Sequence, residues 1–258
     1  DEKNANYLLH CADFERPDSK LLDQQALIER FTSAASGWNM PCKVEISNRL
    51  VASAMVSNTR KAVMLAKGIS LSEKEAAALI NHELGVHMST SLNAASQRLK
   101  VFTLGLPGNT LAQEGLAILN EYHSGNMTLQ RLKGLALRVM AVKEMLKGNS
   151  FRHTFSYLLE EHGMVPDAAF KLAVRVHRGG GFTKDYLYLN GVSQALSLYE
   201  QQDISSLYVG KTGFAYLPII NEMIDRQLVT APYYCPDWLR NPKPSEPVLD
   251  YLMHCIRY

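Results

Sequence analysis

The chain has 258 residues, which is enough for one large domain or two small ones. Hydrophobic residues make up 47% of the chain and charged residues 20%, as is typical of a soluble globular protein. The formal net charge is +2 and there is no long basic run, so we expect neither a nucleic-acid partner nor attachment to a membrane surface.

The four cysteines lie far apart in the sequence and form no Cys-x-x-Cys pair. This spacing argues against a cysteine zinc site and is compatible with reduced thiols in the cytosol. No apolar run approaches the roughly 20 residues that a membrane-spanning helix needs, and no signal peptide is visible. We therefore expect a cytoplasmic protein without a membrane segment.

We expect residues 1–40 to form a helical lead-in to the rest of the chain. Residues 1–16 are polar and predict no definite element. Residues 17–35 place leucine, alanine and Phe31 on one side, and this periodicity predicts a helix.

Three short strands should follow this helix. Val44 and Ile46 alternate with polar residues, and two apolar runs lie at residues 51–56 and 61–66. We expect these strands to form a small antiparallel sheet beside the next helix. Residues 63–65 are our candidate for a free edge to which an extended peptide could add, although a plain core strand explains the same pattern.

Residues 72–88 predict a single helix. Ser72 and Glu75 have the spacing of a capping box, which marks the start of a helix. Good helix formers at residues 76–80 then continue it through an apolar stretch.

The same helix carries a pattern typical of metal sites, His82-Glu83 followed by His87. In the common pattern the two histidines are four residues apart and share a helix face. Here they are five apart, which leaves them roughly 140° out of alignment on a regular helix. Both can reach one ion only if the helix gains a residue locally, as in a π-bulge, and a distorted backbone costs least at Gly85. The alternative is a buried helix with two incidental histidines and a solvated glutamate.

A third candidate ligand lies in residues 111–119, Leu-Ala-Gln-Glu-Gly-Leu-Ala-Ile-Leu. A catalytic zinc usually has three protein ligands and one open position. Glu114 is the charged residue of this otherwise apolar segment, where burying an unpaired carboxylate would be costly and binding a cation would remove the cost. The alternative is a solvent-facing glutamate in the first turn of a helix, where acidic residues are favoured.

Together these motifs resemble a known family. The His-Glu-x-x-x-His pattern combined with Gln-Glu-Gly-Leu-Ala at residues 113–117 is similar to the microtubule-associated tyrosine carboxypeptidases. The bacterial relatives in this family are commonly labelled flavohemoglobin expression-modulating QEGLA-motif proteins. The resemblance extends through residues 104–109 and 182–191 and covers roughly residues 44–245.

The resemblance implies a fold, a cofactor and roles for four residues. It implies that His82, His87 and Glu114 hold Zn²⁺ and that Glu83 is the catalytic glutamate. The implied fold is that of a zincin-type metallopeptidase with a glutamate as the third ligand. In such peptidases a carboxylate four residues after the glutamate often supports a histidine ligand. Here that position is an isoleucine, so the support must come from elsewhere, with Glu121 and Asp185 as candidates.

The C-terminal half of the chain predicts mainly helices. They lie at residues 127–147, 150–162, 166–177, 184–202, 217–228 and 248–258. Residues 208–211 predict a brief extended piece. Five prolines at residues 231–247 predict an irregular segment across the surface.

Basic and phenolic residues flank a glycine run at residues 179–181 and could complete the chemistry. His177 or Tyr188 could donate a hydrogen bond to the negative oxygen that forms during hydrolysis. Arg178 and Lys184 could bind the carboxylate of a substrate. The alternative is a helix end favoured by two basic residues, then a glycine linker and another helix.

These observations predict a mostly helical α+β protein that is a zincin-type metallopeptidase, with a small antiparallel sheet beside the active-site helix. We expect one catalytic domain over residues 1–258, with the sheet and zinc-site helices in residues 41–125 and a helical part in residues 126–258. The expected activity is that of a zinc carboxypeptidase acting on a peptide or protein C-terminus. Two alternatives stay open, a non-catalytic zinc-binding regulatory protein and a zinc amidohydrolase acting on a small molecule.

Overall fold

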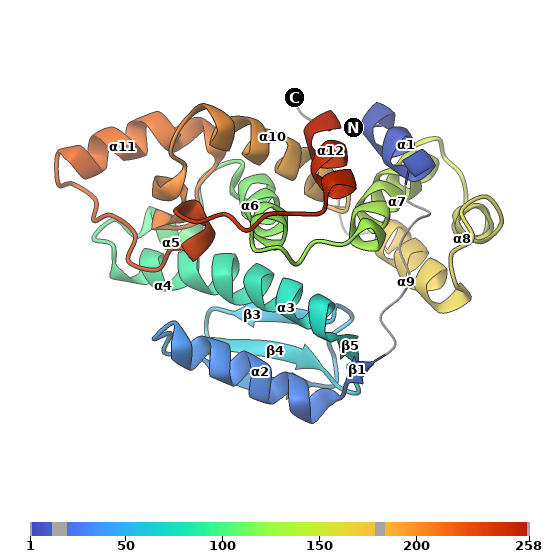
Figure 1. Cartoon of the computed structure of the whole chain (residues 1–258), viewed down its shortest axis with the longest axis horizontal. Helices are drawn as coiled ribbons and strands as arrows, with labels where there is room; N and C mark the ends of the chain where they lie inside the picture. The colour runs from blue at the N-terminus through green and yellow to red at the C-terminus, as the bar shows by residue number, and fades with distance from the viewer. Residues whose placement is uncertain (1, 12–19, 179–183, 257–258) are drawn as a thin grey trace.

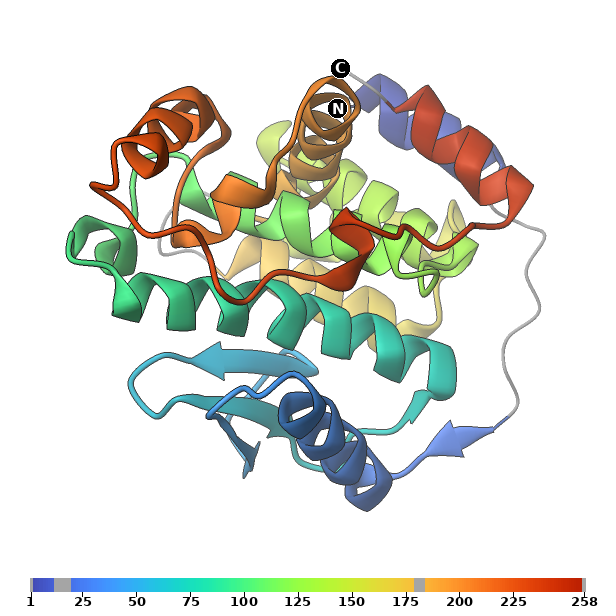
Figure 2. The same ribbon diagram turned by 60° about the vertical axis from the view of Figure 1, so that its left-hand side comes forward.

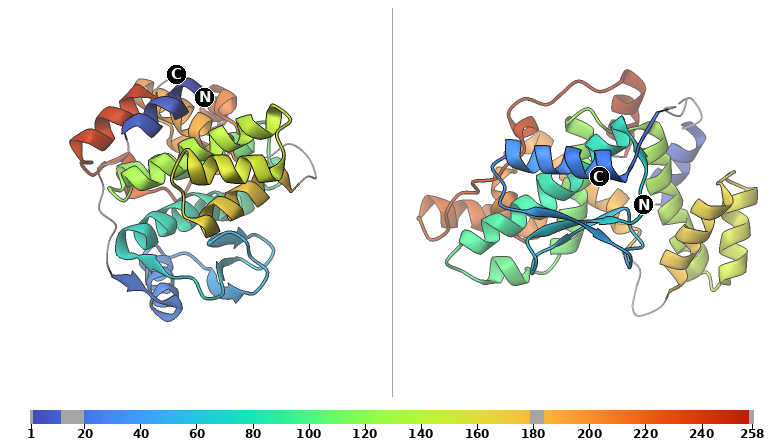
Figure 3. Two further views of the ribbon diagram at one scale, coloured as in Figure 1. Left: turned by 90° about the vertical axis from the view of Figure 1, so that its right-hand side faces the viewer. Right: turned by 90° about the horizontal axis from the view of Figure 1, so that it is seen from below.

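A long helical segment runs through the middle of the molecule, with a small sheet on one side and most of the helices on the other (Figure 1). The computed structural model describes residues 2–11, 20–178 and 184–256. A view from the side shows the same two-sided arrangement (Figure 3, left). The predicted α+β architecture, mostly helical with a small sheet, is therefore confirmed.

The N-terminal elements, up to the start of the long helical segment, are α1 (Glu2–Cys11), β1 (Leu21–Leu22), α2 (Gln24–Gly37), β2 (Lys43–Ser47), β3 (Ala54–Ser57), β4 (Ala62–Ala66) and β5 (Leu71–Ser72). The long segment consists of α3 (Glu73–His82), η1 (Glu83–Met88) and α4 (Ser89–Ser96). The helices that follow are α5 (Val101–Leu104), α6 (Asn109–His123), α7 (Leu129–Leu146), α8 (Phe151–Glu160), α9 (Pro166–His177), α10 (Leu187–Gln201), η2 (Ser205–Val209), η3 (Phe214–Tyr216), α11 (Leu217–Asp225), η4 (Asp237–Leu239) and α12 (Pro247–Cys255).

The three predicted strands form one sheet in the order β2-β4-β3. Strands β3 and β4 are antiparallel, with Met55 opposite Met64, whereas β2 pairs with β4 in parallel. A separate antiparallel pair joins β1 to β5. The expected antiparallel pairing is thus present in β3–β4 and β1–β5, and β2 joins the sheet in the other direction.

The prediction that residues 63–65 form a free edge is wrong. They belong to β4, which lies between β2 and β3, so its hydrogen-bonding groups face strands on both sides. Their side chains are almost entirely buried, as expected of a central strand. The edge nearest to the long helical segment is β3, which contacts η1 (Figure 1).

The N-terminal region also differs from its prediction. The helix expected over residues 17–35 begins at Gln24, because Asp23 caps it by accepting a hydrogen bond from the Ala26 N–H. Leu21 and Leu22, counted as helical in the prediction, pair with β5 instead, and residues 17–19 lie outside the described residues. Helix α1 was not predicted; it packs on α7.

The two largest apolar cores among the described residues lie on opposite sides of the long helical segment. One core packs α2 and the sheet against α3 and η1, and includes Leu84 and Met88. The other contains residues of α1, α6, α7, α10 and α12, and includes Val86. Alternate residues of η1 therefore contribute to the two cores, which fixes this segment between them. Figure 2 shows the long helical segment between the sheet and the other helices.

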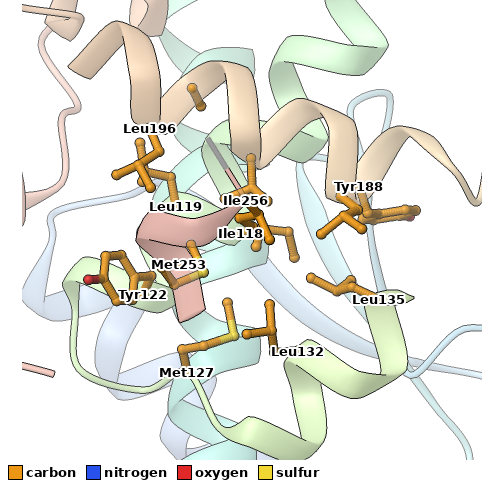
Figure 4. Close-up of a cluster of buried hydrophobic side chains, with 14 of the residues drawn as sticks. Ile118, Leu119, Tyr122, Met127, Leu132, Leu135, Tyr188, Leu196, Met253 and Ile256 are labelled. Carbon is orange, nitrogen blue, oxygen red and sulfur yellow. The ribbon is translucent and has the colours of Figure 1, made fainter. Parts of the chain in front are cut away.

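Helices α6 and α10 cross in close contact within the second core. A Cβ atom added to Gly115 would lie 2.3 Å from the Gly191 carbonyl oxygen, so the crossing leaves no space for a side chain at this point. Larger side chains fill the core around the crossing (Figure 4); those labelled from α6, α7, α10 and the C-terminal region include Ile118, Leu119, Leu132, Leu135, Leu196 and Met253.

The helices predicted in the C-terminal half are present, with ends that differ by a few residues. Residues 208–211 do not form the predicted extended piece, because Ser205–Val209 is a 3-10 helix. Among the described residues, Cys42, Cys235 and Cys255 are free thiols. No helix of the described residues is both long enough and apolar enough to cross a lipid bilayer.

Candidate metal centre

The two histidines of the central helix face one another because the helix changes its winding between them. The capping box predicted at Ser72 and Glu75 is present and starts α3 as a regular helix. Residues Glu83–Met88 then form a π-helix, as the five-residue spacing of His82 and His87 predicts. Their ring centroids lie 4.9 Å apart.

The Asn120 side chain of α6 binds the helix backbone where the winding changes. In a regular α-helix the Asn81 carbonyl would accept a hydrogen bond from the N–H four residues later, at Gly85. In this structure the Asn81 carbonyl accepts a hydrogen bond from the side-chain amide of Asn120 on α6, at 2.6 Å. A Cβ atom on Gly85 would lie 2.1 Å from that amide nitrogen. The space left by a glycine is therefore what lets α6 approach the π-helix here.

Glu114 of α6 completes a group that could hold a metal ion. Its Oε2 lies 3.6 Å from His82 Nε2 and 3.8 Å from His87 Nε2, and the donor atoms of the three residues all lie within 4.8 Å of one another. Ligand atoms of a tetrahedral zinc are about 3.3 Å apart, given metal–ligand distances of about 2.0–2.1 Å. Small movements of these side chains would bring them to that spacing.

Two buried carboxylate oxygens support the same interpretation. Among the described residues, Oε2 of Glu83 and Oε2 of Glu114 are buried without a hydrogen-bond partner. The two residues are only 6% and 5% exposed. A buried carboxylate oxygen without a partner is costly, and a cation at this position would remove the cost. The donor set and its unpartnered oxygens therefore fit a divalent metal.

Glu121, one of the two carboxylates that the sequence left open, contacts a histidine of the candidate metal group. Its Oε1 lies 2.7 Å from His82 Nδ1, and Arg131 of α7 donates two hydrogen bonds of 2.8 Å to its carboxylate. Glu121 follows Glu114 by two helical turns, so both project from the same face of α6. Asp185, the other candidate, binds Arg175 of α9 instead, at 2.7 and 2.9 Å.

These contacts set the protonation of the site. Burial alone would raise the pKa of Glu121, but the charge and hydrogen bonds of Arg131 lower it to about 2. Burial alone would lower the pKa of His82, but the carboxylates of Glu114 and Glu121 raise it to about 9. His82 therefore lies in a strongly negative environment, which favours a cation, whether a proton or a metal ion.

Two adjoining hollows meet at His82 and Glu83. The first, of about 410 Å³, extends to Arg131, Gly134 and Arg138 of α7, and we call it the α7 pocket. The second, of about 600 Å³, extends past β3 and is also lined by His87, Glu114, Arg178, Lys184 and Lys211; we call it the β3 cleft. Arg175 and Tyr188 line both hollows, so the candidate metal group lies where they join.

The structure brings together most of the residues predicted around the glycine run. Tyr188 lines both hollows, and Arg178 lines the β3 cleft at an exposed position. Lys184 also lines the cleft, with its Nζ 2.8 Å from Glu114 Oε1. His177 is not brought to the site: its Nε2 lies 2.9 Å from Thr154 Oγ1, and its ring contacts Phe151 of α8. The glycine run itself lies outside the described residues.

Three arginines near the site were not predicted. Arg131 and Arg138 lie seven residues apart on α7 and face the α7 pocket, and Arg175 lies on α9. Charged residues at this spacing on a mainly apolar helix are a usable signal, because buried charges need partners. The partners themselves come from α6 and from Asp185, which only the tertiary structure reveals.

The outer edge of β3, with which no other strand of the described residues pairs, borders the cleft. The Ala66 N–H donates to the Ser53 carbonyl, so in this antiparallel register the bonded pairs include Met55 with Met64. The backbone groups of Ala54 and Val56 consequently point away from β4, toward the free side. Both residues line the β3 cleft.

Comparison with known protein families gives a match over nearly the whole chain. A family model described as microtubule-associated tyrosine carboxypeptidase matches residues 2–257, nearly the whole chain, and confirms the resemblance carried by the sequence motifs. No curated protein matches the chain. The matched range includes the π-helix, α6 and the walls of both hollows.

Proposed function

Because the chain belongs to the microtubule-associated tyrosine carboxypeptidase family, we propose that it is a zinc-dependent peptidase that removes a residue from the C-terminus of a peptide or protein. The observation that carries this proposal is the convergence of His82, His87 and Glu114 beside Glu83. The proposal includes a zincin-type fold, with a glutamate as the third metal ligand. Zinc held here supplies a Lewis acid and lowers the pKa of water, the chemistry that hydrolysis of a peptide bond requires.

Glu83 is the proposed general base. It lies next to a proposed ligand, lines both hollows, and has a buried oxygen without a partner among the described residues. It takes up the proton of the attacking water and then delivers it to the leaving amine. Glu121 holds the Nδ1 side of His82, which leaves Nε2 directed at Glu114 and the metal position.

Tyr188 is the proposed donor to the developing oxyanion. It lines both hollows, and it would therefore lie beside a peptide bond that is cut at their junction. A phenol donor that is already positioned stabilises negative charge without reorganisation during the reaction. Its ring packs under the Arg138 guanidinium at 4.5 Å, which holds it in place.

The β3 cleft is the proposed site of the peptide that remains after cleavage. An extended backbone can pair with the outward-facing groups of Ala54 and Val56, as in other cases of strand addition. Arg178 and Lys184 also line this cleft and are the proposed substrate-binding cations. A cleft beside a free strand edge favours a peptide over a small amide substrate, which argues against the amidohydrolase alternative.

The direct test is cleavage of peptides that differ only at the C-terminus. We expect the zinc-loaded protein to shorten peptides with a free C-terminal carboxylate by one residue, as detected by mass spectrometry, and to spare their C-terminal amides. The Glu83→Gln variant should keep zinc but lose the activity, because glutamine has nearly the same shape and cannot accept the proton.

Each other outcome selects another function. Equal cleavage of acid and amide peptides would indicate an endopeptidase. Failure of the zinc-loaded protein to cleave any member of a randomised peptide mixture would contradict the proposal and favour the regulatory alternative. Retention of most of the activity by Glu83→Gln would remove Glu83 as the base.

A further inference from the structure

A glycine in the middle of α7 leaves space that no other part of the described chain fills. Gly134 lines the α7 pocket, and a Cβ atom added there would meet no atom within 4 Å. Glycine in a helix interior costs about 1 kcal/mol relative to alanine. Close packing does not require it here, in contrast to Gly115 at the α6–α10 crossing. What Gly134 provides is room inside the α7 pocket.

The same wall of the pocket carries an arginine whose charge is poorly compensated. Arg131 binds Glu121 through two hydrogen bonds, and Arg175 binds Asp185. For Arg138, the carboxylate oxygen within 4.0 Å among the described residues is Asp185 Oδ1, at 3.9 Å. The Arg138 side chain is 20% exposed. Its further contact is with the face of the Tyr188 ring, which carries no formal charge to balance it.

The surroundings of Arg138 add to this imbalance. Burial and then the nearby charge of Arg131 lower its pKa, with Arg175 contributing in the same direction. Three guanidinium groups thus line one pocket, and two of them already hold carboxylates. An anion that entered the pocket and bound Arg138 would relieve the repulsion and gain a charge-assisted hydrogen bond.

We propose that the α7 pocket receives the C-terminal residue that is released, with Arg138 binding its carboxylate and Gly134 providing room for a large side chain. This inference rests on the proposed function, because it takes the bond that is cut to lie beside Glu83, where the pocket begins. A volume of about 410 Å³ is near the lower end of the range of roughly 300–1,000 Å³ for small-molecule sites, and fits one residue. The carboxylate role expected from the sequence at Arg178 and Lys184 therefore passes to Arg138, since both of those residues line the β3 cleft and Lys184 already has Glu114 as its partner.

A binding experiment tests the pocket separately from hydrolysis. The zinc-loaded Glu83→Gln protein is titrated calorimetrically with N-acetylphenylalanine, its amide, and N-acetylglycine. We expect the acid to bind more tightly than the amide. Adding Arg138→Gln should weaken binding of the acid about 10- to 100-fold, the scale for losing a partly buried charge partner, and leave the amide nearly unchanged. Arg226→Gln, at an exposed pair with Glu222 on α11, is the matched control.

A second substitution tests the room in the pocket. Gly134→Phe should abolish binding of N-acetylphenylalanine and retain binding of N-acetylglycine, since its ring would fill the space and no neighbour lies within 4 Å of the new Cβ. Circular dichroism and thermal unfolding verify that each variant is folded. In active protein, the same substitution should shift cleavage toward peptides that end in small residues.

The outcomes separate the two proposals. The parent protein could cleave peptides while folded Arg138→Gln and Gly134→Phe variants bind the acid as tightly as the parent does. That result would overturn the pocket assignment and leave the proposed peptidase activity standing. The opposite result is selective binding of the acid that Arg138→Gln weakens and Gly134→Phe abolishes, with no cleavage of any peptide. It would support the pocket assignment and contradict the proposed peptidase activity. Equal affinity for the acid and the amide would overturn the role of Arg138.

Discussion

At the scale of single residues, a chain of contacts extends from α7 to the candidate metal group. Arg131 holds Glu121, and Glu121 holds the Nδ1 side of His82. The consequence is that His82 presents Nε2 to Glu114 and His87 in a fixed orientation. Partners of this kind are commonly worth 10- to 100-fold in metal affinity.

Glu121→Gln should therefore weaken zinc binding about 10- to 100-fold, because an uncharged amide holds the imidazole less strongly and does not raise its basicity. Competition with a chromophoric chelator measures the change. Glu144→Gln is the matched control, since Glu144 is also a buried glutamate but binds Lys147 and Asn149, away from the site. Equal zinc affinities for Glu121→Gln and the control would contradict this role.

His123 gives the protein a predictable acid sensitivity. It stacks on Trp238, with ring centroids 4.7 Å apart, and its burial lowers its pKa from the ordinary value of 6.5 to about 4. The unfolded chain then binds a proton as pH falls below 6.5 and the folded chain does not, until about pH 4. The stability that His123 contributes is thus fully present above pH 6.5 and is lost between pH 6.5 and 4, by up to about 1.4 kcal/mol per pH unit.

His123→Phe should keep the stacking and reduce the loss of stability between pH 6.5 and 4. Urea unfolding at several pH values measures the slope for each protein. The control is His10→Phe, the same substitution at an exposed position of α1. Parallel slopes for the wild type and His123→Phe would show that His123 is not a source of the acid sensitivity.

Local patterns predicted the three residues that could hold a metal ion, and tertiary packing decided which other residues surround them. The five-residue spacing of His82 and His87 requires a local distortion, and the π-helix is present where Gly85 predicts it. A histidine that binds a metal usually needs a supporting carboxylate, and the sequence offered Glu121 and Asp185 for this role. The sequence cannot say which way a helix end faces, so His177, although next to the glycine run, was wrongly expected at the site; it faces α8.

At the scale of elements, the close crossing of α6 and α10 holds Glu114 and Tyr188 in place. Glu114 lies next to Gly115, where α6 touches α10, and Tyr188 lies in the first turn of α10. A side chain at Gly115 would meet the backbone of Gly191, which cannot move aside as a side chain can. The two helices would have to separate, and the site residues would move with them.

Gly115→Ala should therefore lower the free energy of unfolding by about 3 kcal/mol, a typical upper cost of overpacking. Gly134→Ala, in the interior of α7 with open space around it, should raise it by about 1 kcal/mol. Chemical denaturation compares the two substitutions, which are chemically identical. If they change the stability by the same amount, the close crossing does not require a glycine.

Most elements could be predicted from the sequence, but their arrangement could not. Periodicity and capping residues located the three strands of the sheet and most helices, including the capping box at Ser72. Apolar content could not order the strands, because a buried strand such as β4 reads as an apolar run whether or not it lies at an edge. The N-terminal helix α1 was not predicted, because Ala5 and Leu8, which belong to the core where α1 packs on α7, stand among polar residues and give too weak an apolar periodicity.

At the scale of the whole molecule, η1 joins the two cores and also lies between the two hollows. Leu84 and Met88 belong to one core, and Val86 to the other. His82 and Glu83 line both hollows. A metal ion bound here would therefore connect α3, η1 and α6, and we expect its removal to affect both cores together.

Chelation should lower the melting temperature by about 10 °C in a single transition. Zinc at about 1,000 times its dissociation constant stabilises the folded state by about 4 kcal/mol, and each kcal/mol shifts the melting temperature of a chain near this size by about 2–4 °C. Differential scanning calorimetry with and without a chelator measures the change. Two transitions, one of them unmoved by the chelator, would show that the cores unfold independently.

The most direct test of the central claim is a zinc-edge anomalous diffraction map of crystals of the zinc-loaded protein. We predict one peak about 2.0–2.2 Å from His82 Nε2, His87 Nε2 and a Glu114 oxygen, with water at a fourth, open position. Crystals of the His82→Ala/His87→Ala double variant, treated identically, should lack the peak. A peak elsewhere, a peak that persists in the double variant, or a fourth protein ligand that closes the site would contradict the account.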